Sequence, residues 1–154
     1  LKTVTITGRT GPLSLRAFPH ATAITVIMDS TGTAALRLTS ELDSDNTALE
    51  SLRIFGYEGG VQIGGYNSTV RDTAALMQLS HCKALRELRL NHCGLTDLAF
   101  ASGLSNLEIL DVSGNRIEDV SPLTDLPKLR LLLSADNAIQ NIAVLRGRDL
   151  VVSE

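Results

Sequence analysis

The sequence predicts an α/β solenoid, a stack of coils that each contribute one strand to a parallel sheet. Two observations carry this prediction. An apolar phrase repeats with a step of 22 residues, and apolar and polar residues alternate within each copy. A fixed period of this length is typical of repeat architectures, in which neighbouring coils stack and bury a continuous core. We expect loops and short helical turns to connect the strands.

The repeat is regular in the second half of the chain. Its three matching copies are Leu85-x-x-Leu88-x-Leu90-x-x-Cys93-x-Leu95, Leu107-x-x-Leu110-x-Val112-x-x-Asn115-x-Ile117 and Leu129-x-x-Leu132-x-Ser134-x-x-Asn137-x-Ile139. Looser copies begin at Leu1, Ala21 and Leu49, which gives successive intervals of 20, 28, 36, 22 and 22 residues. We expect one domain over residues 1–154, with irregular repeats and insertions in 1–78 and regular repeats and a terminal strand in 79–154.

The segments between the predicted strands carry helix and turn signals. Ser121-Pro122 predicts a short 3₁₀ or α turn, with the serine as N-cap and the proline at the first helical position. Thr69-x-x-Asp72 is a possible capping box that would open a longer helix over residues 70–82. The glycine-rich segment 56–66 predicts an irregular loop or a small hairpin, with a ligand-contacting loop as the alternative. It lacks the lysine and the spacing of a phosphate-binding loop.

Residues 107–129, LEILDVSGNRIEDVSPLTDLPKL, resemble leucine-rich repeats. They are similar to the 22-residue subclass of internalins and phosphatase regulatory subunits, in which Asn-x-Ile-x-Asp-Ile-x-Pro-Leu follows the strand. The matching residues here are Asn115-Arg-Ile117-Glu-Asp119-Val120-Ser-Pro122-Leu123. A weaker likeness, of Leu88-Arg-Leu90-Asn-His-Cys93, is to trypanosomatid leucine-rich repeat proteins. The resemblance covers residues 79–145 well and 1–78 loosely. It implies a horseshoe-like solenoid with the parallel sheet on the concave face and loops and short helical turns on the convex face.

In such a solenoid the repeated leucines point inward, and Asn115 and Asn137 lie buried at the turn after the strand. A side-chain amide there can bond loop backbone groups that have no partner in the sheet. Cys93 stands at the same position in its own copy. The looser copies place Arg9, Asp29 and Tyr57 there instead.

Bulk composition argues against several functions. The chain has 154 residues with 14 basic and 17 acidic side chains, so it lacks the basic footprint of a nucleic-acid binder. No apolar run approaches the ~18 residues that span a bilayer, so we expect no membrane insertion. Two cysteines make no disulfide framework, which favours a reducing, cytoplasmic location. Because the sequence starts at Leu1 and not at methionine, a leader or an upstream domain could have been removed.

Neither catalysis nor metal binding is expected. His81-Cys82 and His92-Cys93 offer four zinc-ligating side chains, but the intervening strand would hold the cysteines roughly 15–20 Å apart. We expect two buried free thiols and surface histidines instead. No nucleophile motif accompanies the serines and histidines, so we predict no catalytic residue and no cofactor.

The side chains predicted to leave the sheet outward form three columns. They are Thr3, Ala23, Ser51, Glu87, Ile109, Leu131; then Thr5, Thr25, Arg53, Arg89, Asp111, Leu133; and then Thr7, Ile27, Phe55, Asn91, Ser113, Ala135. The predicted partner-binding residues among them are Arg53, Phe55, Glu87, Arg89, Asn91, Ile109, Asp111, Leu131 and Leu133, with Arg89, Asp111 and Leu133 as the strongest candidates. Alternatively, a following segment covers Leu131 and Leu133, and the charged residues form ordinary surface pairs.

The predicted function is therefore a non-catalytic module that recognises a protein partner through its concave face. Two alternatives stay open. One is a structural or regulatory segment of a larger enzyme or scaffold. The other is a surface adhesin of the internalin kind, which a secretory leader upstream of Leu1 would favour. The last residues, 149–154, look like one more strand, and an unprotected last strand would offer a docking or aggregation edge.

Overall fold

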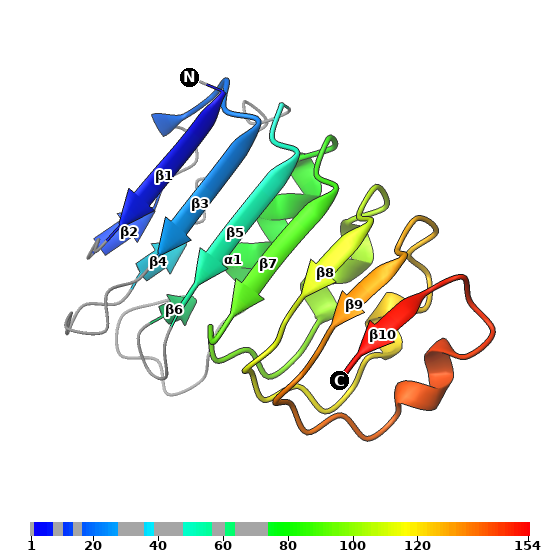
Figure 1. The fold of residues 1–154 in the computed structure, drawn as a ribbon. Coiled ribbons are helices and arrows are strands. Elements are labelled where there is room, and N and C mark those ends of the chain that lie inside the picture. The colour runs from blue at the N-terminus through cyan, green and yellow to red at the C-terminus, as the bar shows by residue number, and fades with distance from the viewer. Residues whose placement is uncertain are drawn as a thin grey trace.

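A computed structural model of the chain describes residues 2–7, 11–13, 17–27, 36–38, 48–56, 61–63 and 74–154. Within these residues the main feature is a seven-stranded, open, parallel sheet, which Figure 1 shows face-on. Its strands follow chain order and are β1 (Thr3–Thr7), β3 (Ala23–Ile27), β5 (Ser51–Phe55), β7 (Glu87–Asn91), β8 (Ile109–Asp111), β9 (Leu131–Leu133) and β10 (Val151–Ser153). This arrangement confirms the predicted α/β solenoid, and β10 is the terminal strand expected in 149–154.

Equivalent positions of successive repeats are paired in the sheet, as the repeat predicts. The paired positions that open each strand are Thr3, Ala23, Ser51, Glu87, Ile109, Leu131 and Val151. The register confirms the first two predicted columns in full, and it confirms the third column from Thr7 to Asn91. Because the side-chain period of a strand is two, this register decides which residues face the core and which face outward.

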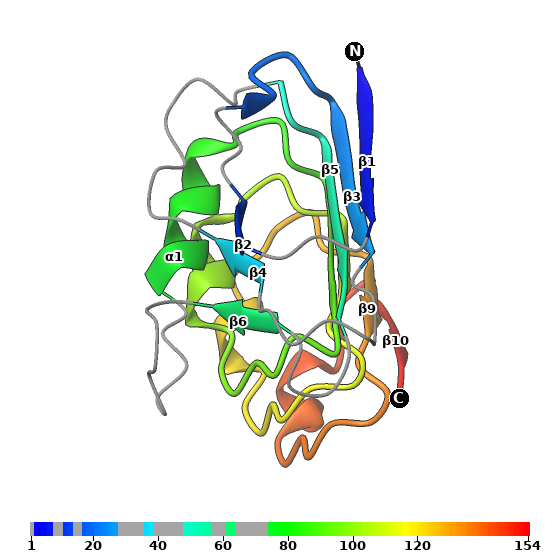
Figure 2. The same cartoon turned by 90° about the vertical axis from the view of Figure 1, so that its left-hand side faces the viewer.

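The core lies behind the sheet, where the repeated aliphatic residues stack from coil to coil. Leu88, Leu110 and Leu132 are neighbours in the register and are fully buried. Burial of a leucine side chain stabilises the fold by about 2 kcal/mol, so a stack of such residues is the main cohesive element. Figure 2 shows the layers edge-on, with the sheet on one side and the helical segments on the other.

A second, three-stranded sheet occupies the first coils. Its strands are β2 (Gly11–Leu13), β4 (Leu36–Leu38) and β6 (Val61–Ile63), all parallel, and they lie behind the main sheet in Figure 1. The prediction of a loop or hairpin for 56–66 was wrong for residues 61–63, because Val61–Ile63 pairs in parallel with the preceding coil. The glycines on either side, at 59–60 and 64–65, lie outside the described residues.

The convex segments are short, as expected. They are α1 (Ala74–Met77) and the 3₁₀ turns Gln78–His81, Ala99–Gly103, Ser121–Leu123 and Ile142–Leu145. The helix predicted over 70–82 is wrong in its second half, which is 3₁₀, and its predicted capping box lies outside the described residues. The predicted turn at Ser121-Pro122 is confirmed, but Ser121 is not its N-cap. Val120 precedes the turn without a side-chain cap, and Asp119 Oδ1 accepts the Ser121 N–H at 2.7 Å.

The asparagines join successive coils, as predicted. Asn115 is buried; its Oδ1 accepts the N–H groups of Cys93 at 3.0 Å and Leu95 at 2.9 Å. Its Nδ2 donates to the carbonyls of Leu90 at 2.8 Å and Val112 at 2.6 Å. One side chain thus bonds its own coil and the preceding one. Arg9, Asp29 and Tyr57, at the equivalent positions of the looser copies, lie outside the described residues.

Asn137 repeats this arrangement one coil later. Its Oδ1 accepts the Ile117 N–H at 3.0 Å, and its Nδ2 donates to Val112 O at 2.9 Å and Ser134 O at 3.0 Å. The two asparagines therefore meet at Val112, whose carbonyl accepts from both. Asn115 and Asn137 thus form a hydrogen-bonded asparagine column along the turns that follow the strands.

The turn after each regular strand also requires a left-handed backbone. Residues one coil apart, His92, Gly114 and Asp136, have φ of 52°, 72° and 56°. Gly114 also lacks space for a side chain, because an added Cβ would lie 2.4 Å from the ring of His92. Glycine is the residue that meets both conditions at once.

Replacing Gly114 with alanine should therefore destabilise the protein more than the same change at Gly147. Gly147 has φ of 82° but nothing within 4 Å of an added Cβ, so Gly147→Ala isolates the backbone cost of about 1 kcal/mol. Gly114→Ala should cost a further 1 kcal/mol or so from the clash with His92. Urea denaturation of both variants measures the difference, and equal losses would contradict the packing of His92 against Gly114.

Candidate functional site

The outward columns make one face of the main sheet, here called the open face, which none of the described helices and strands covers (Figure 2). It corresponds to the predicted concave face and turns away from α1 and the 3₁₀ turns (Figure 2). The candidate residues named from the sequence all lie on it or at its edge, on the adjacent strands β5, β7, β8 and β9. The structure thus brings together side chains that are up to 80 residues apart in the sequence.

A chain of ion pairs crosses the middle of the open face. Arg53 Nη2 lies 2.7 Å from Glu87 Oε2, and Arg89 Nε lies 2.6 Å from Glu87 Oε1. Arg89 Nη1 then reaches Asp111 Oδ2 at 3.2 Å. The four alternating charges span β5, β7 and β8, so this ion-pair chain ties the less regular coils to the regular ones.

Polar side chains complete the ion-pair chain at both ends. Ser51 Oγ donates to Glu87 Oε2 at 2.9 Å, and Asn91 Nδ2 donates to Asp111 Oδ1 at 2.8 Å. Ser113 donates to the same Asp111 oxygen from its N–H and its hydroxyl. The Asp111 side chain is only 8% exposed, whereas that of Arg53 is 43% exposed. Asp111 therefore acts mainly within the fold, and Arg53 is the charge most accessible to a partner.

The ion pairs shift the pKa values of Glu87 and Arg89. Burial alone would raise the pKa of the Glu87 carboxyl, but hydrogen bonds from Arg53, Arg89 and Ser51 outweigh it and lower the pKa to about 2. The hydrogen bond to Glu87 raises the pKa of the Arg89 guanidinium, so both groups are charged at neutral pH. Glu87 and Arg89 therefore form a charged pair at the centre of the ion-pair chain.

The ion-pair chain also holds two polar atoms without a partner. Arg53 Nε and Asn91 Oδ1 are enclosed, and neither has a hydrogen bond within the described part of the chain. Such groups cost stability, and they concentrate at functional sites. Their presence sets this part of the open face apart from the fully satisfied asparagine column behind it.

An apolar patch adjoins the ion-pair chain on the C-terminal side. It consists of Ile109, Leu131 and Leu133, which are half-buried, and Val151, which is 64% exposed. β10 lies beside Leu131 in the sheet and places Val151 next to it, so this strand enlarges the patch and does not cover it. Sequence reasoning missed Val151, although the period of two along 149–154 could have placed it in the first column.

A shallow pocket of about 400 Å³ opens at the rim of this patch. It is lined by Ile109, Leu131, Val151, Arg130 and Asp149. Arg130 is held by Glu108, with Nη2 to Oε2 at 3.1 Å, and Glu108 also lies 3.9 Å from Arg86. The apolar floor is therefore bordered by charged groups from the residues that precede the strands.

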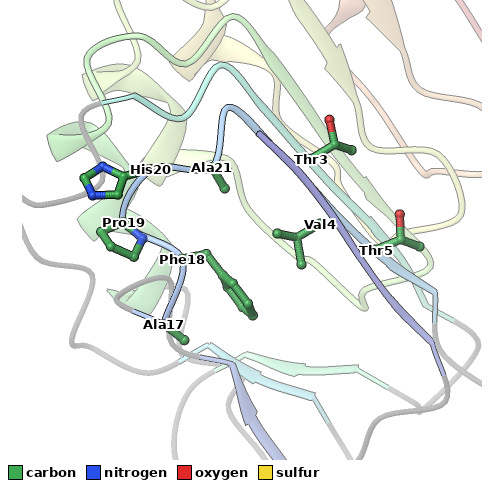
Figure 3. A pocket seen from close by; sticks show the side chains of 8 residues that line it. All are labelled: Thr3, Val4, Thr5, Ala17, Phe18, Pro19, His20 and Ala21. Atoms are coloured by element: carbon green, nitrogen blue, oxygen red, sulfur yellow. The ribbon is translucent and has the colours of Figure 1, made fainter. Parts of the chain in front are cut away.

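A second pocket, of about 450 Å³, lies at the N-terminal end of the stack. Figure 3 shows the ring of Phe18 and the methyl groups of Val4 directed toward its interior. Both residues pack against the main core. The pocket continues the core beyond β1 and is separate from the residues predicted to bind a partner.

The cysteines and histidines lie as the sequence predicts. Cys82 and Cys93 are buried free thiols, and burial raises the pKa of the Cys82 thiol to about 11. The three histidines, His20, His81 and His92, are exposed. Over the described ranges, no cluster of three metal-ligating side chains occurs.

Comparison with known families identifies the repeats. A family model of two leucine-rich repeats matches residues 83–125 and, one coil later, 105–147. Residues 83–147 are therefore leucine-rich repeats. The match covers the regular coils. In the earlier coils, β3 pairs in parallel with β5, and β5 pairs in parallel with β7 in the same sheet. Proteins built from such repeats generally act as protein-interaction modules.

Solved leucine-rich repeat structures share the fold. An internalin from Listeria monocytogenes is 20% identical with a TM-score of 0.66, over 91% of this chain and 36% of that one. The leucine-rich repeat domain of the type III effector XopL is 20% identical with a TM-score of 0.69, over 99% and 50%. A leucine-rich repeat protein from Leptospira interrogans is 13% identical with a TM-score of 0.58, over 88% and 38%. This chain thus spans half or less of these three proteins.

Neither a curated relative nor a membrane-spanning helix was found for the parts of the chain that could be searched. No curated protein matches the chain in sequence. Among the described residues, no helix has the length and apolar character needed to cross a membrane.

The Glu87 ion pairs predict a specific pH dependence of stability. Folding lowers the pKa of the Glu87 carboxyl from 4.5 to about 2, so its contribution is present above about pH 4.5 and is lost as the pH falls toward 2. The unmodified protein should have a higher free energy of unfolding than the Glu87→Gln variant at pH 7. The difference between the two free energies should be smaller at pH 3. Urea denaturation at several pH values measures this difference. A carbon-13 titration of the folded protein that places the Glu87 midpoint near 4.5 would contradict it.

Proposed function

We propose that this protein is a non-catalytic interaction module whose open face binds a protein partner. The observation that carries the proposal is the contiguous apolar patch of Ile109, Leu131, Leu133 and Val151 on the open face. A contiguous apolar cluster exposed to water usually marks an interface, because its burial by a partner is favourable. The extended faces of solenoids are the surfaces on which such proteins typically bind.

The ion-pair chain beside the patch supports the same proposal. Arg53, Glu87 and Arg89 hold one another in fixed positions, so a partner would meet charges that are already oriented. Arg53 is the most exposed of them and lies beside Phe55, and arginine and aromatic residues are frequent anchors at interfaces. In this proposal the patch supplies affinity, while the ion pairs select the partner and its orientation.

The role of a structural or regulatory segment within a larger protein remains compatible with the same face, because the partner could be another domain of that protein. This chain spans 36% of the internalin and 50% of the XopL domain described above, and these shares motivate the alternative. The internalin-like adhesin is the other alternative from the sequence, and it adds a cell-surface location to the same mode of binding.

Leu133→Ser should weaken partner binding at least about tenfold, because it removes apolar surface from the patch beside the ion-pair chain. The partner is first recovered from cell extract with the unmodified chain and identified by mass spectrometry. Its dissociation constant is then measured for each variant by calorimetry. Val144→Ser is the matched control, since Val144 is an exposed apolar residue on the 3₁₀ turn Ile142–Leu145, away from the sheet.

Both variants should keep a melting temperature close to that of the parent, so that a change in binding reports on the surface. Equal affinity of the Leu133→Ser variant and the parent would contradict the proposal. A loss shared by Leu133→Ser and Val144→Ser would contradict it as well, because it would place recognition outside the open face.

A further inference from the structure

The pocket at the C-terminal rim of the open face combines an apolar floor with a carboxylate. Ile109, Leu131 and Val151 occupy one column on three adjacent strands. With strands about 4.8 Å apart, this floor is about 10 Å long, which is enough for the extended stem of a long side chain. Arg130 and Asp149 line the same pocket.

The positive charge at the pocket is already engaged. The Arg130 guanidinium approaches Glu108 Oε2 from Nε at 3.2 Å and from Nη2 at 3.1 Å. Arg148, which precedes Asp149, is turned the other way, since its guanidinium donates to the carbonyls of Leu123, Thr124 and Leu126. Neither arginine is therefore directed at the carboxylate of Asp149.

The negative charge at the pocket is available. Asp149 is exposed, and no ion pair or hydrogen bond to its carboxylate forms with any residue that the structure describes. An apolar ligand side chain would remove water from this carboxylate without giving it a new hydrogen bond or ion pair. An acidic side chain would be repelled by the carboxylate. A basic side chain satisfies both parts of the pocket, because its methylene stem can lie on apolar surface while its charged end reaches a carboxylate.

We infer that this pocket binds a lysine or arginine side chain of the protein partner, with the stem on Ile109, Leu131 and Val151 and the cation at Asp149. The inference rests on the proposed function, since it names the group that the partner presents at one end of the open face. It also gives the interaction a direction, because the unpaired carboxylate lies at the β10 end and the exposed Arg53 guanidinium lies on β5.

The test uses two small probes of matched shape and the whole chain. N-acetyl-lysine N-methylamide carries the stem and the ammonium group, and N-acetyl-norleucine N-methylamide carries the stem alone. Each is titrated to tens of millimolar while carbon-13 methyl spectra follow Ile109, Leu131 and Val151. The lysine probe should shift these methyl signals and bind about fivefold more tightly than the norleucine probe, as an added charge pair at a surface implies.

Two variants separate the charge at the pocket from the net charge of the protein. Asp149→Asn should bring the affinity for the lysine probe down to that for the norleucine probe. Asp136→Asn is the matched control, since Asp136 is exposed and lies at the turn after β9, at the other end of the strands. It should leave both affinities unchanged.

Equal affinity for the two probes, or no methyl shifts with either, would overturn the inference. So would an equal loss in Asp149→Asn and Asp136→Asn, because it would indicate attraction by overall charge. These outcomes are distinguishable from a failure of the proposed function, which is tested at Leu133. Leu133 does not line this pocket, so partner binding can depend on Leu133 even if the pocket prefers another side chain.

Discussion

The side-chain amide of Asn115, together with that of Asn137, is the interaction on which the regular half of the structure depends. Where the chain leaves a strand, its backbone groups lose their partners in the sheet, and burying them unpaired would cost about 1–3 kcal/mol each. Asn115 offers one acceptor and two donors at this point and bonds Cys93, Leu95, Leu90 and Val112. The coils can therefore turn sharply and still stack at the spacing of a sheet.

The stacking defines the open face. Once the coils are in register, Leu88, Leu110 and Leu132 align inward, and the residues between them must align outward. The outward columns hold the ion pairs of Arg53, Glu87 and Arg89 at one place and the apolar patch at another. Recognition, in the proposed function, is therefore a property of columns that form only when consecutive coils are stacked.

The sequence was sufficient for the fold and for the register of the regular coils, because both follow from the 22-residue period and the period of two. In the earlier coils, with intervals of 20, 28 and 36 residues, a looser match to the same apolar pattern predicted the columns. The sequence was insufficient for β2, β4 and β6, since a three-residue strand such as Val61–Ile63 leaves too short a pattern to detect beside glycines. The N-cap at Ser121 was misplaced because the turn begins one residue earlier than expected: Val120 is the N-cap, and the Ser121 N–H donates to Asp119. Val151 was missed because the columns were ended one strand too early. The roles of individual outward residues depend on contacts across strands, such as the burial of Asp111, which no linear pattern reveals.

Amide hydrogen exchange of the folded chain tests the central claim most directly, namely that side-chain amides hold the turns after the strands. The N–H groups of Cys93 and Leu95 donate to Asn115, and that of Ile117 donates to Asn137, although none of the three lies in a strand. They should exchange as slowly as the amides of the central strand β7, because opening them requires separation of the coils. Exchange at the rate of solvent-exposed loop amides would contradict the account.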